Sequence, residues 1–141
     1  MKRVYLAGPF FNETEVKNIE RAEQILEARG FELFSPMRHE VRTDLGSVQW
    51  ARDIFEMDRS EIDKADVVVM LYYGVYSDSG TAWECGYAYA KGVPVVVVHV
   101  DETADSNLMV HMGCVTNISL GDLATYDFDA LPRYEYTGDM L

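Results

Sequence analysis

Two uninterrupted apolar runs constrain the fold of this chain more than any other feature of its sequence. The runs are Asp66–Tyr72, with the letters DVVVMLY, and Pro94–His99, with the letters PVVVVH. Strands with one solvent-exposed face alternate apolar and polar residues, whereas continuous β-branched runs are typical of strands buried on both faces. We therefore predict that both runs are central strands of a parallel sheet. Arg3–Ala7 and Phe31–Phe34 are shorter candidate strands.

Segments with helical spacing separate these four strands. Helices are predicted over residues 13–29, 48–64 and 79–91, the last one ending at Gly92. Strands that alternate with helices of this length imply right-handed crossovers and a sheet covered on both faces, which is the doubly wound α/β class. The segment 120–141 is acidic and aromatic, and we expect it to pack as a short helix followed by an ordered strap.

Composition excludes several classes of function. With 141 residues, of which 48% are hydrophobic, the chain is long enough for one compact domain, residues 1–141, and too short for two. The 24 acidic and 12 basic residues give a net charge of −12, which disfavours binding to nucleic acid and to anionic membranes. No apolar run reaches the roughly 18 residues of a membrane span, and we expect no signal peptide. The two cysteines, Cys85 and Cys114, are expected to be free thiols in a cytoplasmic protein.

Two loops are predicted to carry the chemistry. In a small doubly wound sheet, the ligand crevice lies beyond the carboxyl ends of the strands, at the point where the winding direction reverses. In the flavodoxin-like strand order this point lies between the first and third strands. The loops that follow these strands are Gly8–Asn12 and Tyr73–Gly80.

The second predicted helix has an acidic residue on its apolar face. Its apolar stripe consists of Ala51, Ile54, Phe55, Ile62 and Ala65. Asp58 completes the helical spacing of this stripe, which predicts a carboxylate on the buried face. Two interpretations stay open, because either a nearby backbone N–H or Arg59 satisfies this carboxylate structurally, or the carboxylate serves a functional site.

The third predicted helix contains a single acidic residue, Glu84, among small and aromatic residues. Small side chains let this helix lie close to the sheet, and the helix dipole near its N-terminus favours an ionised carboxylate. Glu84 is therefore either an available carboxylate in the crevice or a glutamate that points to water. Asp78 has a similar pair of interpretations, because either Asp78 or Ser79 is suited to be the N-cap.

Three carboxylates converge on the predicted crevice. They belong to Asp58, Asp78 and Glu84, and Tyr5 of the first strand is able to reach them. Paired acids in a dry pocket suit glycosyl transfer, in which one acts as nucleophile and the other moves a proton on the leaving group. A metal site is disfavoured, because the crevice loops hold neither a Walker motif nor a basic cluster and the histidines are widely separated. We expect carboxylate catalysis without a metal or other cofactor.

Four segments carry a family resemblance. They are residues 5–11 (YLAGPFF), Met57-Asp58, residues 78–88 (DSGTAWECGYA) and residues 106–109 (SNLM). Together they resemble the nucleoside 2-deoxyribosyltransferase family, and the segment 78–88 is the most specific part. The resemblance implies a flavodoxin-like fold with a five-stranded parallel sheet. It also implies an enzyme of nucleoside salvage that exchanges the base of a 2′-deoxynucleoside through a covalent deoxyribosyl–enzyme ester, with retention of configuration.

The resemblance also implies roles for the acidic residues. Glu84 corresponds to the nucleophile, and Tyr5 would orient it. Asp58 and Asp78 match the family's acids near the base and the sugar, which protonate the leaving group and contact the sugar hydroxyls. Transfer instead of hydrolysis requires that water be kept away from the ester. The candidates for this are Phe10, Phe11, Trp83 and Met109 of the partner subunit.

The partners implied by the resemblance are small molecules and other copies of this chain. Gly8, Phe10 and Phe11 are expected to bind the substrates, a 2′-deoxynucleoside and a free nucleobase. Asn107 and Met109 match a segment that reaches into the neighbouring subunit's pocket in the family, where the asparagine contacts the sugar. A homo-oligomer is therefore implied, with a dimer unit assembled into a hexamer.

Three other functions stay open. A 2′-deoxynucleoside 5′-monophosphate N-glycosidase is a hydrolase on a related scaffold, which holds the phosphate through serine and arginine in its first loop. Here the loop Gly8–Asn12 offers proline and aromatic residues instead, which favours an uncharged 5′-hydroxyl. A flavin carrier or phospho-receiver is disfavoured because the loops lack the motifs of either, and a non-catalytic interaction domain is the third alternative. The loop 35–40 matches no base-specific pattern, so the sequence predicts no base preference.

Overall fold

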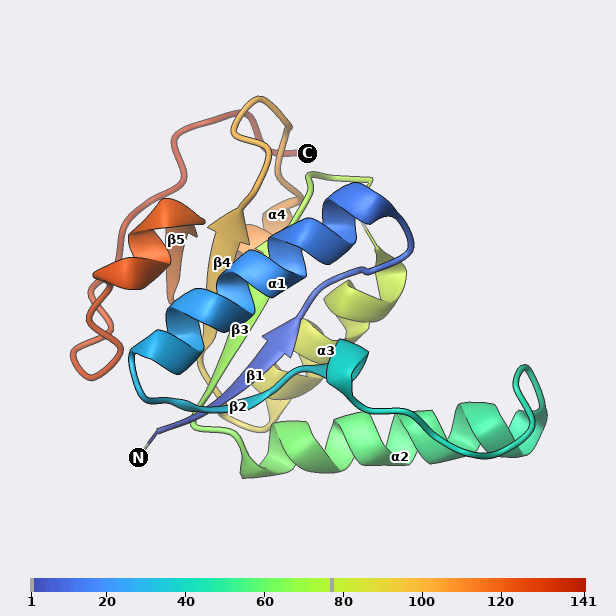
Figure 1. The fold of residues 1–141 in the computed structure, drawn as a ribbon. Coiled ribbons are helices and arrows are strands. Elements are labelled where there is room, and N and C mark those ends of the chain that lie inside the picture. Colours follow the sequence, from blue (N-terminus) through green and yellow to red (C-terminus); the bar gives the residue numbers. More distant parts are fainter. Residues whose placement is uncertain (1, 77) are drawn as a thin grey trace.

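The computed structural model describes residues 2–76 and 78–141, which form a five-stranded sheet with helices on both faces (Figure 1). The strands are β1 (Arg3–Ala7), β2 (Glu32–Phe34), β3 (Val67–Tyr72), β4 (Val95–His99) and β5 (Thr116–Ser119). Their order in the sheet is β2-β1-β3-β4-β5, and every pair is parallel. This is the flavodoxin-like order, in which the winding direction changes between β1 and β3. The predicted fold class is confirmed.

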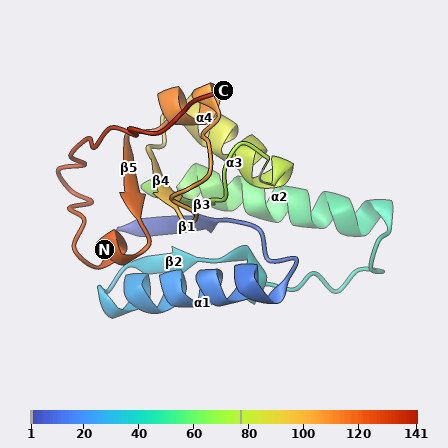
Figure 2. The ribbon, with the colours of Figure 1, turned by 90° about the horizontal axis from the view of Figure 1, so that it is seen from above.

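The helices form two layers around the sheet. They are α1 (Glu13–Ala28), α2 (Val48–Lys64), α3 (Ser79–Ala90) and α4 (Leu108–Gly113), with short 3₁₀ turns η1 (Pro36–Arg38) and η2 (Gly121–Ala124). Figure 2 shows α1 on one face of the sheet and α2, α3 and α4 on the other. The first three helices agree with the predicted ones within one residue. Side-chain caps explain where they begin, because Asn12, Ser47 and Asp78 each accept a hydrogen bond from the backbone of the first turn.

β3 is buried on both faces along its whole length, as its β-branched run predicted. On one face, Val69 of β3 belongs to the same apolar cluster as Leu26 of α1. On the other face, Met70 belongs to a cluster with Ile62 of α2 and Ala88 of α3. These two cores hold the carboxyl ends of β1 and β3 between rigid layers, and the loops that follow the strands are therefore anchored at their bases.

The prediction that the whole apolar stripe of α2 is buried is wrong. Ile62 is fully buried, whereas Phe55 is 45% exposed and Ala51 is also exposed. Figure 1 shows that the N-terminal half of α2 extends past the edge of the sheet, so that its C-terminal half alone lies close to the strands. Amphipathic spacing predicts which face of a helix is apolar, but it does not predict how far the neighbouring sheet reaches.

β5 and α4 were not predicted from the residues themselves. The sequence of β5 is polar, and yet Thr116 and Asn117 are buried in it. The C-terminal segment satisfies both side chains, because the Tyr134 N–H donates to Thr116 Oγ1 at 2.8 Å and Asn117 Nδ2 donates to the Tyr134 carbonyl oxygen at 3.2 Å. The predicted short helix and strap after residue 120 are confirmed, and the strap supplies the polar partners that make this edge strand possible.

Cys85 and Cys114 are buried free thiols, as expected from the sequence. Burial raises the pKa of both thiols, so that they stay protonated near neutral pH. Across the described ranges, the structure contains no helix with the length and apolar character needed to span a bilayer.

Candidate active site

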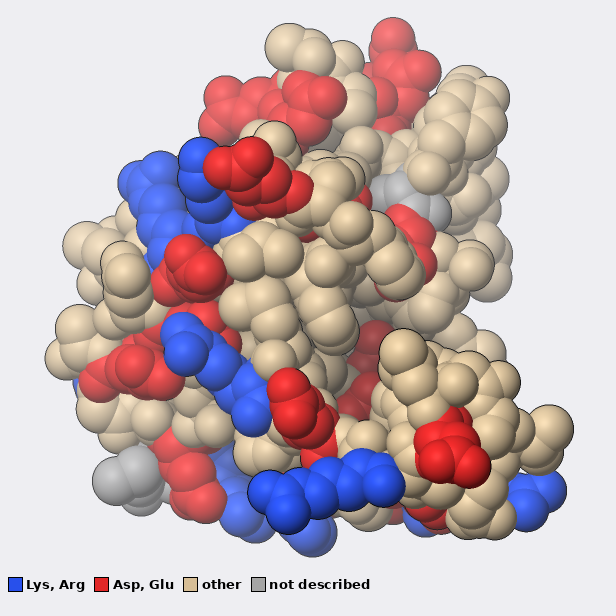
Figure 3. Space-filling model, turned by 45° about the vertical axis from the view of Figure 1, so that its right-hand side comes forward, with Lys and Arg blue, Asp and Glu red and all other residues tan. Residues whose placement is uncertain are grey.

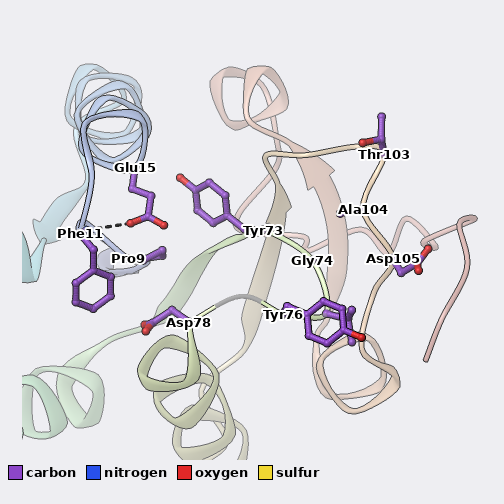
Figure 4. A pocket seen from close by; sticks show the side chains of 11 residues that line it. Pro9, Phe11, Glu15, Tyr73, Gly74, Tyr76, Asp78, Thr103, Ala104 and Asp105 are labelled. Carbon is purple, nitrogen blue, oxygen red and sulfur yellow. Dashed lines mark hydrogen bonds between the residues drawn. The ribbon is translucent and has the colours of Figure 1, made fainter.

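The loops after β1, β3 and β4 enclose a cavity of about 550 Å³ (Figure 4). The described residues that line it are Pro9, Phe11, Glu15, Tyr73, Gly74, Val75, Tyr76, Asp78, Thr103, Ala104 and Asp105. Both loops predicted to carry the chemistry contribute to this lining; Ser77 of the second loop lies outside the described residues. The loop after β4, which contributes residues 103–105, was not predicted.

Tyr5 of β1 and Glu84 of α3 form a part-buried pair between the sheet and the helix. The Tyr5 hydroxyl donates a hydrogen bond to Glu84 Oε2. The Tyr5 side chain has no exposed surface, and its ring stacks on that of Phe34 with the centroids 5.6 Å apart. Because packing fixes the phenol ring, the hydrogen bond holds the Glu84 carboxyl group in one orientation.

Burial raises the pKa of Glu84 from its ordinary value of 4.5 to about 7. The hydrogen bond from Tyr5 opposes this shift, and the negative charges of Asp58 and Asp78 add to it. The sequence had suggested that the helix dipole keeps Glu84 ionised, but loss of solvent outweighs that effect. Near pH 7 the carboxyl group therefore exists in both protonation states.

Asp58 lies near this pair with one oxygen atom unsatisfied. Its Oδ1 is buried and has no hydrogen-bond partner among the described residues. Arg59 does not satisfy it, because this guanidinium pairs with Glu56 and Asp63 instead. Burial raises the pKa of Asp58 to about 6, and its charge acts on Glu84. A buried carboxyl oxygen without an internal partner is uncommon, and a functional contact is one explanation for it.

Asp78 is the N-cap of α3, and it also lines the cavity. Its Oδ2 accepts hydrogen bonds from the Thr81 backbone N–H at 2.8 Å and from Thr81 Oγ1 at 2.7 Å. Both bonds use the same oxygen, which leaves Oδ1 available to a substrate hydroxyl. Capping and a contact with the cavity are therefore compatible in this residue, and Ser79 is not the cap.

The three predicted substrate-binding residues of the first loop have different positions relative to the cavity. Gly8 allows a close approach of the chain to the core, because an added Cβ would lie 3.0 Å from Ile19 Cδ1 and 3.1 Å from Leu71 Cβ. Phe11 lines the cavity, and the Phe10 ring stacks on it at a centroid distance of 6.4 Å. Phe11 is 82% exposed, so the loop alone does not close the cavity.

Asn107 and Met109 line a second cavity of about 430 Å³ between α3 and α4. Asn107 caps α4, since its side chain accepts a hydrogen bond from the Met109 N–H at 2.9 Å. Its own backbone N–H donates to the Tyr72 hydroxyl at 2.8 Å. The structure does not bring these two residues into the cavity of Phe11 and Asp78 within one chain.

The first cavity is acidic. Its described lining contains Glu15, Asp78 and Asp105 and no lysine, arginine or histidine. Figure 3 shows acidic side chains deep in the hollow of one face, whereas most basic side chains lie toward the left and the bottom of this view. Sequence reasoning missed Glu15, although its position three residues after Asn12 is a capping signal. Asn12 Oδ1 accepts from the Glu15 N–H, and Glu15 Oε1 accepts from the Phe11 N–H, each at 2.9 Å.

Tyr5, Asp58 and Glu84 lie outside the described lining of the first cavity, and of the three predicted acids Asp78 alone belongs to it. Asp58 and Glu84 are close enough for their charges to interact, and with Tyr5 they provide the groups that nucleophilic and acid–base chemistry needs. Glu84 offers a carboxylate oriented by Tyr5, and Asp58 offers a carboxyl group that exchanges its proton near neutral pH. A fixed carboxylate beside a proton donor is what cleavage of a glycosidic bond requires. Within the described part of the chain, no group of three or more His, Cys, Asp or Glu side chains is arranged to hold a metal ion.

Glu84→Gln is expected to stabilise the fold at alkaline pH. Because the pKa of Glu84 rises from 4.5 in the unfolded chain to about 7 in the folded one, folding favours the protonated form. Wild-type stability therefore falls as the pH rises from about 4.5 through 7. The gain in the amide variant is small at pH 4 and reaches about 3 kcal/mol at pH 8. Urea denaturation at both pH values measures it, and an equal gain at the two would contradict a buried carboxylate.

Comparisons with known proteins identify the family of this chain. The sequence model of the nucleoside 2-deoxyribosyltransferase family matches residues 4–119. The solved structure of a 2-deoxyribosyltransferase from Bacillus psychrosaccharolyticus is similar at a TM-score of 0.85 and 34% identity, over 95% of this chain and 98% of that one. Two curated relatives are each 28% identical to the chain.

One of these relatives is a nucleoside deoxyribosyltransferase of Limosilactobacillus fermentum, aligned over 137 residues, 86% of this chain and 82% of the relative. The other is a Thermofilum pendens protein provisionally named 2′-deoxynucleoside 5′-phosphate N-hydrolase 1, aligned over 105 residues, 74% of this chain and 72% of the relative. The family match covers most of the chain. The chain therefore belongs to the nucleoside 2-deoxyribosyltransferase family.

Proposed function

We propose that this protein transfers the 2-deoxyribosyl group of a 2′-deoxynucleoside to another purine or pyrimidine base, as an enzyme of nucleoside salvage. The observation that carries the proposal is the part-buried pair of Tyr5 and Glu84 with the unpartnered carboxyl oxygen of Asp58 nearby. Family membership supports deoxyribosyl chemistry in general. The arrangement of the carboxyl groups supports the covalent route.

In the first half-reaction, the ionised Glu84 carboxylate attacks C1′ of the sugar. The bond between C1′ and the base nitrogen breaks, and its electron pair leaves with the base, which takes a proton from Asp58. A 2-deoxy sugar lacks the electron-withdrawing 2′-hydroxyl, so its oxocarbenium-like transition state is easier to reach. The product is an ester between Glu84 and C1′.

In the second half-reaction, a nitrogen of the incoming base attacks C1′ and the ester bond to Glu84 breaks. The Asp58 carboxylate then accepts the proton that the incoming base loses. Each half-reaction inverts the configuration at C1′, and two inversions give overall retention. The unpartnered Oδ1 of Asp58 is suited to both proton transfers.

The working enzyme needs Glu84 ionised and Asp58 protonated, so that the pair holds one proton. Burial raises the pKa of Glu84 to about 7 and that of Asp58 to about 6. A pair with one proton is therefore the main form between about pH 6 and 7. Because Glu84 has the higher pKa, the proton lies mostly on Glu84, and the reactive arrangement with the proton on Asp58 is the minor form of this pair. Both carboxyl groups are thus tuned for proton exchange close to neutral pH.

We also propose that the protein acts as a homo-oligomer, with a dimer unit assembled into a hexamer. The second cavity is an open groove between α3 and α4, and large apolar side chains in its lining are exposed to solvent. Met109 is 74% exposed, Met112 68% and Tyr89 67%. A second copy that covers this groove would remove the apolar patch from water. It would also allow Asn107 to reach a neighbouring sugar site and help to exclude water from the ester. Light scattering tests this assembly, and a fully active monomer would contradict it.

The acidic cavity supports a nucleoside substrate over a nucleoside 5′-monophosphate. Carboxylates of Glu15, Asp78 and Asp105 line it, and the described lining offers no cation for a phosphate. A phosphate dianion placed among three carboxylates would be repelled in a region of reduced solvent screening. Hydrolysis of a monophosphate, the activity in the name of the Thermofilum pendens relative, is the alternative that this observation disfavours.

Incubation of the protein with deoxyinosine, with and without adenine, tests the proposed function. We expect chromatography to show deoxyadenosine only when adenine is present, because the ester persists until a second base attacks it. A parallel incubation contains a deoxynucleoside 5′-monophosphate. Free base released chiefly from this monophosphate would contradict the transferase and support the hydrolase.

A further inference from the structure

Residues 103–107, here called the site segment, lie in the loop that connects β4 to α4 and line both cavities. Asp105 lines the acidic cavity, and Asn107 lines the groove between α3 and α4. The segment lies outside the regular strands and helices, so its position depends on its neighbours. Two hydrogen bonds connect it to β3 and to the loop that follows β3. The Val75 N–H donates to the Asp105 carbonyl at 2.9 Å, and the Asn107 N–H donates to the Tyr72 hydroxyl at 2.8 Å.

The C-terminal strap, residues 133–141, also contacts the site segment, through backbone hydrogen bonds. The Ser106 N–H donates to the Asp139 carbonyl at 3.0 Å, and the Leu141 N–H donates to the Ser106 carbonyl at 2.8 Å. These bonds form a parallel bridge between Ser106 and Met140. Figures 1 and 2 show the C-terminal end beside α4. The strap thus places a short strand-like partner along the site segment.

Tyr136 is the side chain that connects the strap to the start of the site segment. Its hydroxyl donates to the Ala104 carbonyl at 2.9 Å. Its ring stacks on His99 with centroids 4.8 Å apart and packs edge-on against His111. The backbone at Gly138 lies directly over the hydroxyl, because an added Cβ there would be 2.3 Å from Tyr136 Oη. The phenol group is therefore confined by contacts on several sides.

We propose that Tyr136 is a positioning residue for nucleoside binding. By holding the Ala104 carbonyl, it orders the site segment before substrate arrives, so that binding does not have to supply this ordering. The inference rests on the proposed function of the site. Tyr136 does not contact Glu84 or Asp58, and its contribution is therefore to affinity and not to the chemical steps.

Tyr136→Phe tests this role, because it removes the hydroxyl and keeps the stacked ring. We expect KM for deoxyinosine to rise about fivefold, with kcat changed less than about twofold. Tyr134→Phe is the matched control in the same strap. Its side chain is 55% exposed, and the hydrogen bonds of Tyr134 in the described structure come from its backbone. We expect this control to keep the wild-type KM.

Gly138→Ala provides a second, independent variant. Its new methyl group occupies the space next to Tyr136 Oη and would push the hydroxyl away from Ala104. We expect the same rise in KM as in Tyr136→Phe. Gly121→Ala is the matched control, because its Cβ would meet no described atom closer than 4.0 Å and neither glycine has a positive φ.

Calorimetric titration with deoxyinosine separates this inference from the proposed function. The titrations are made in the Glu84→Gln background, which forms no ester, and the dissociation constant is expected to rise about fivefold when Tyr136→Phe is added. Equal dissociation constants with and without Tyr136→Phe in this background would overturn the positioning role. Equal losses of affinity in Tyr136→Phe and Tyr134→Phe would also overturn it, because a general weakening of the strap would then explain both. Normal binding by the wild type without base exchange would contradict the proposed function alone.

Discussion

Glu84→Gln is expected to lower the rate of base exchange by about 10⁴-fold or more. The amide cannot form the ester with C1′, although it keeps the shape of the side chain and an oxygen acceptor for the Tyr5 hydroxyl. Chromatography of deoxyadenosine formed from deoxyinosine and adenine measures the rate. Mass spectrometry of the protein incubated with deoxyinosine alone detects the intermediate directly. The wild type should gain the mass of one deoxyribosyl group, and the variant should gain none.

The control for this prediction is Glu20→Gln, which makes the same chemical change at an exposed position of α1. It should exchange bases at the wild-type rate and form the adduct. If Glu84→Gln kept a rate near that of the wild type, the assignment of the nucleophile would be wrong. A folded variant is expected in either case, because removal of a buried charge stabilises the protein at neutral and alkaline pH.

Asp58→Asn is expected to lower the exchange rate by about 10²- to 10³-fold. The amide does not deliver a proton to the leaving base, so the base must leave as an anion. The loss should depend on the leaving group. A purine deoxynucleoside methylated at N7 already carries a positive charge and leaves without protonation, and its cleavage by the variant should approach the wild-type rate. An equal loss with both substrates would contradict the role of Asp58 as proton donor.

The pH profile distinguishes the two carboxyl groups further. For the wild type we expect kcat/KM to rise with an apparent pKa near 6 and to fall with one near 7, because only the singly protonated pair is active. In Asp58→Asn the falling limb should disappear, since Glu84 alone is left to titrate and works only when ionised. Glu56→Gln, an exposed change on the same helix, should keep both limbs.

Local sequence patterns determined most of the fold. The β-branched runs placed β3 and β4, because a strand with apolar residues on both faces is stable only inside a covered sheet. The extent of α2 burial was not predictable in this way, since exposure of Phe55 depends on where the sheet ends. β5 was also missed, because its polar residues are satisfied by the backbone of Tyr134, which is distant in sequence.

Some residues of the candidate site were also predictable from the sequence, and others were not. The residues of the segment 78–88 and the family resemblance pointed to Glu84 and Asp78, and the interrupted stripe of α2 pointed to Asp58. The acidic lining was only partly foreseen, because Glu15 and Asp105 reach the cavity through a helix cap and through a loop after β4. Neither position has a periodic signal.

The sequence by itself determined the order of the first four strands and the first three helices, the family resemblance, and Asp58, Asp78 and Glu84 as candidate acids, because these depend on residue types and on short spacings. Only the tertiary structure decided the protonation behaviour of Glu84 and the position of the site segment. The pKa of Glu84 follows from burial between α3 and β1. The site segment is held by hydrogen bonds from a strap about 30 residues further along the chain, such as that from Tyr136 to Ala104. Burial and long-range hydrogen bonding arise from the packing of distant segments, which local sequence patterns do not encode.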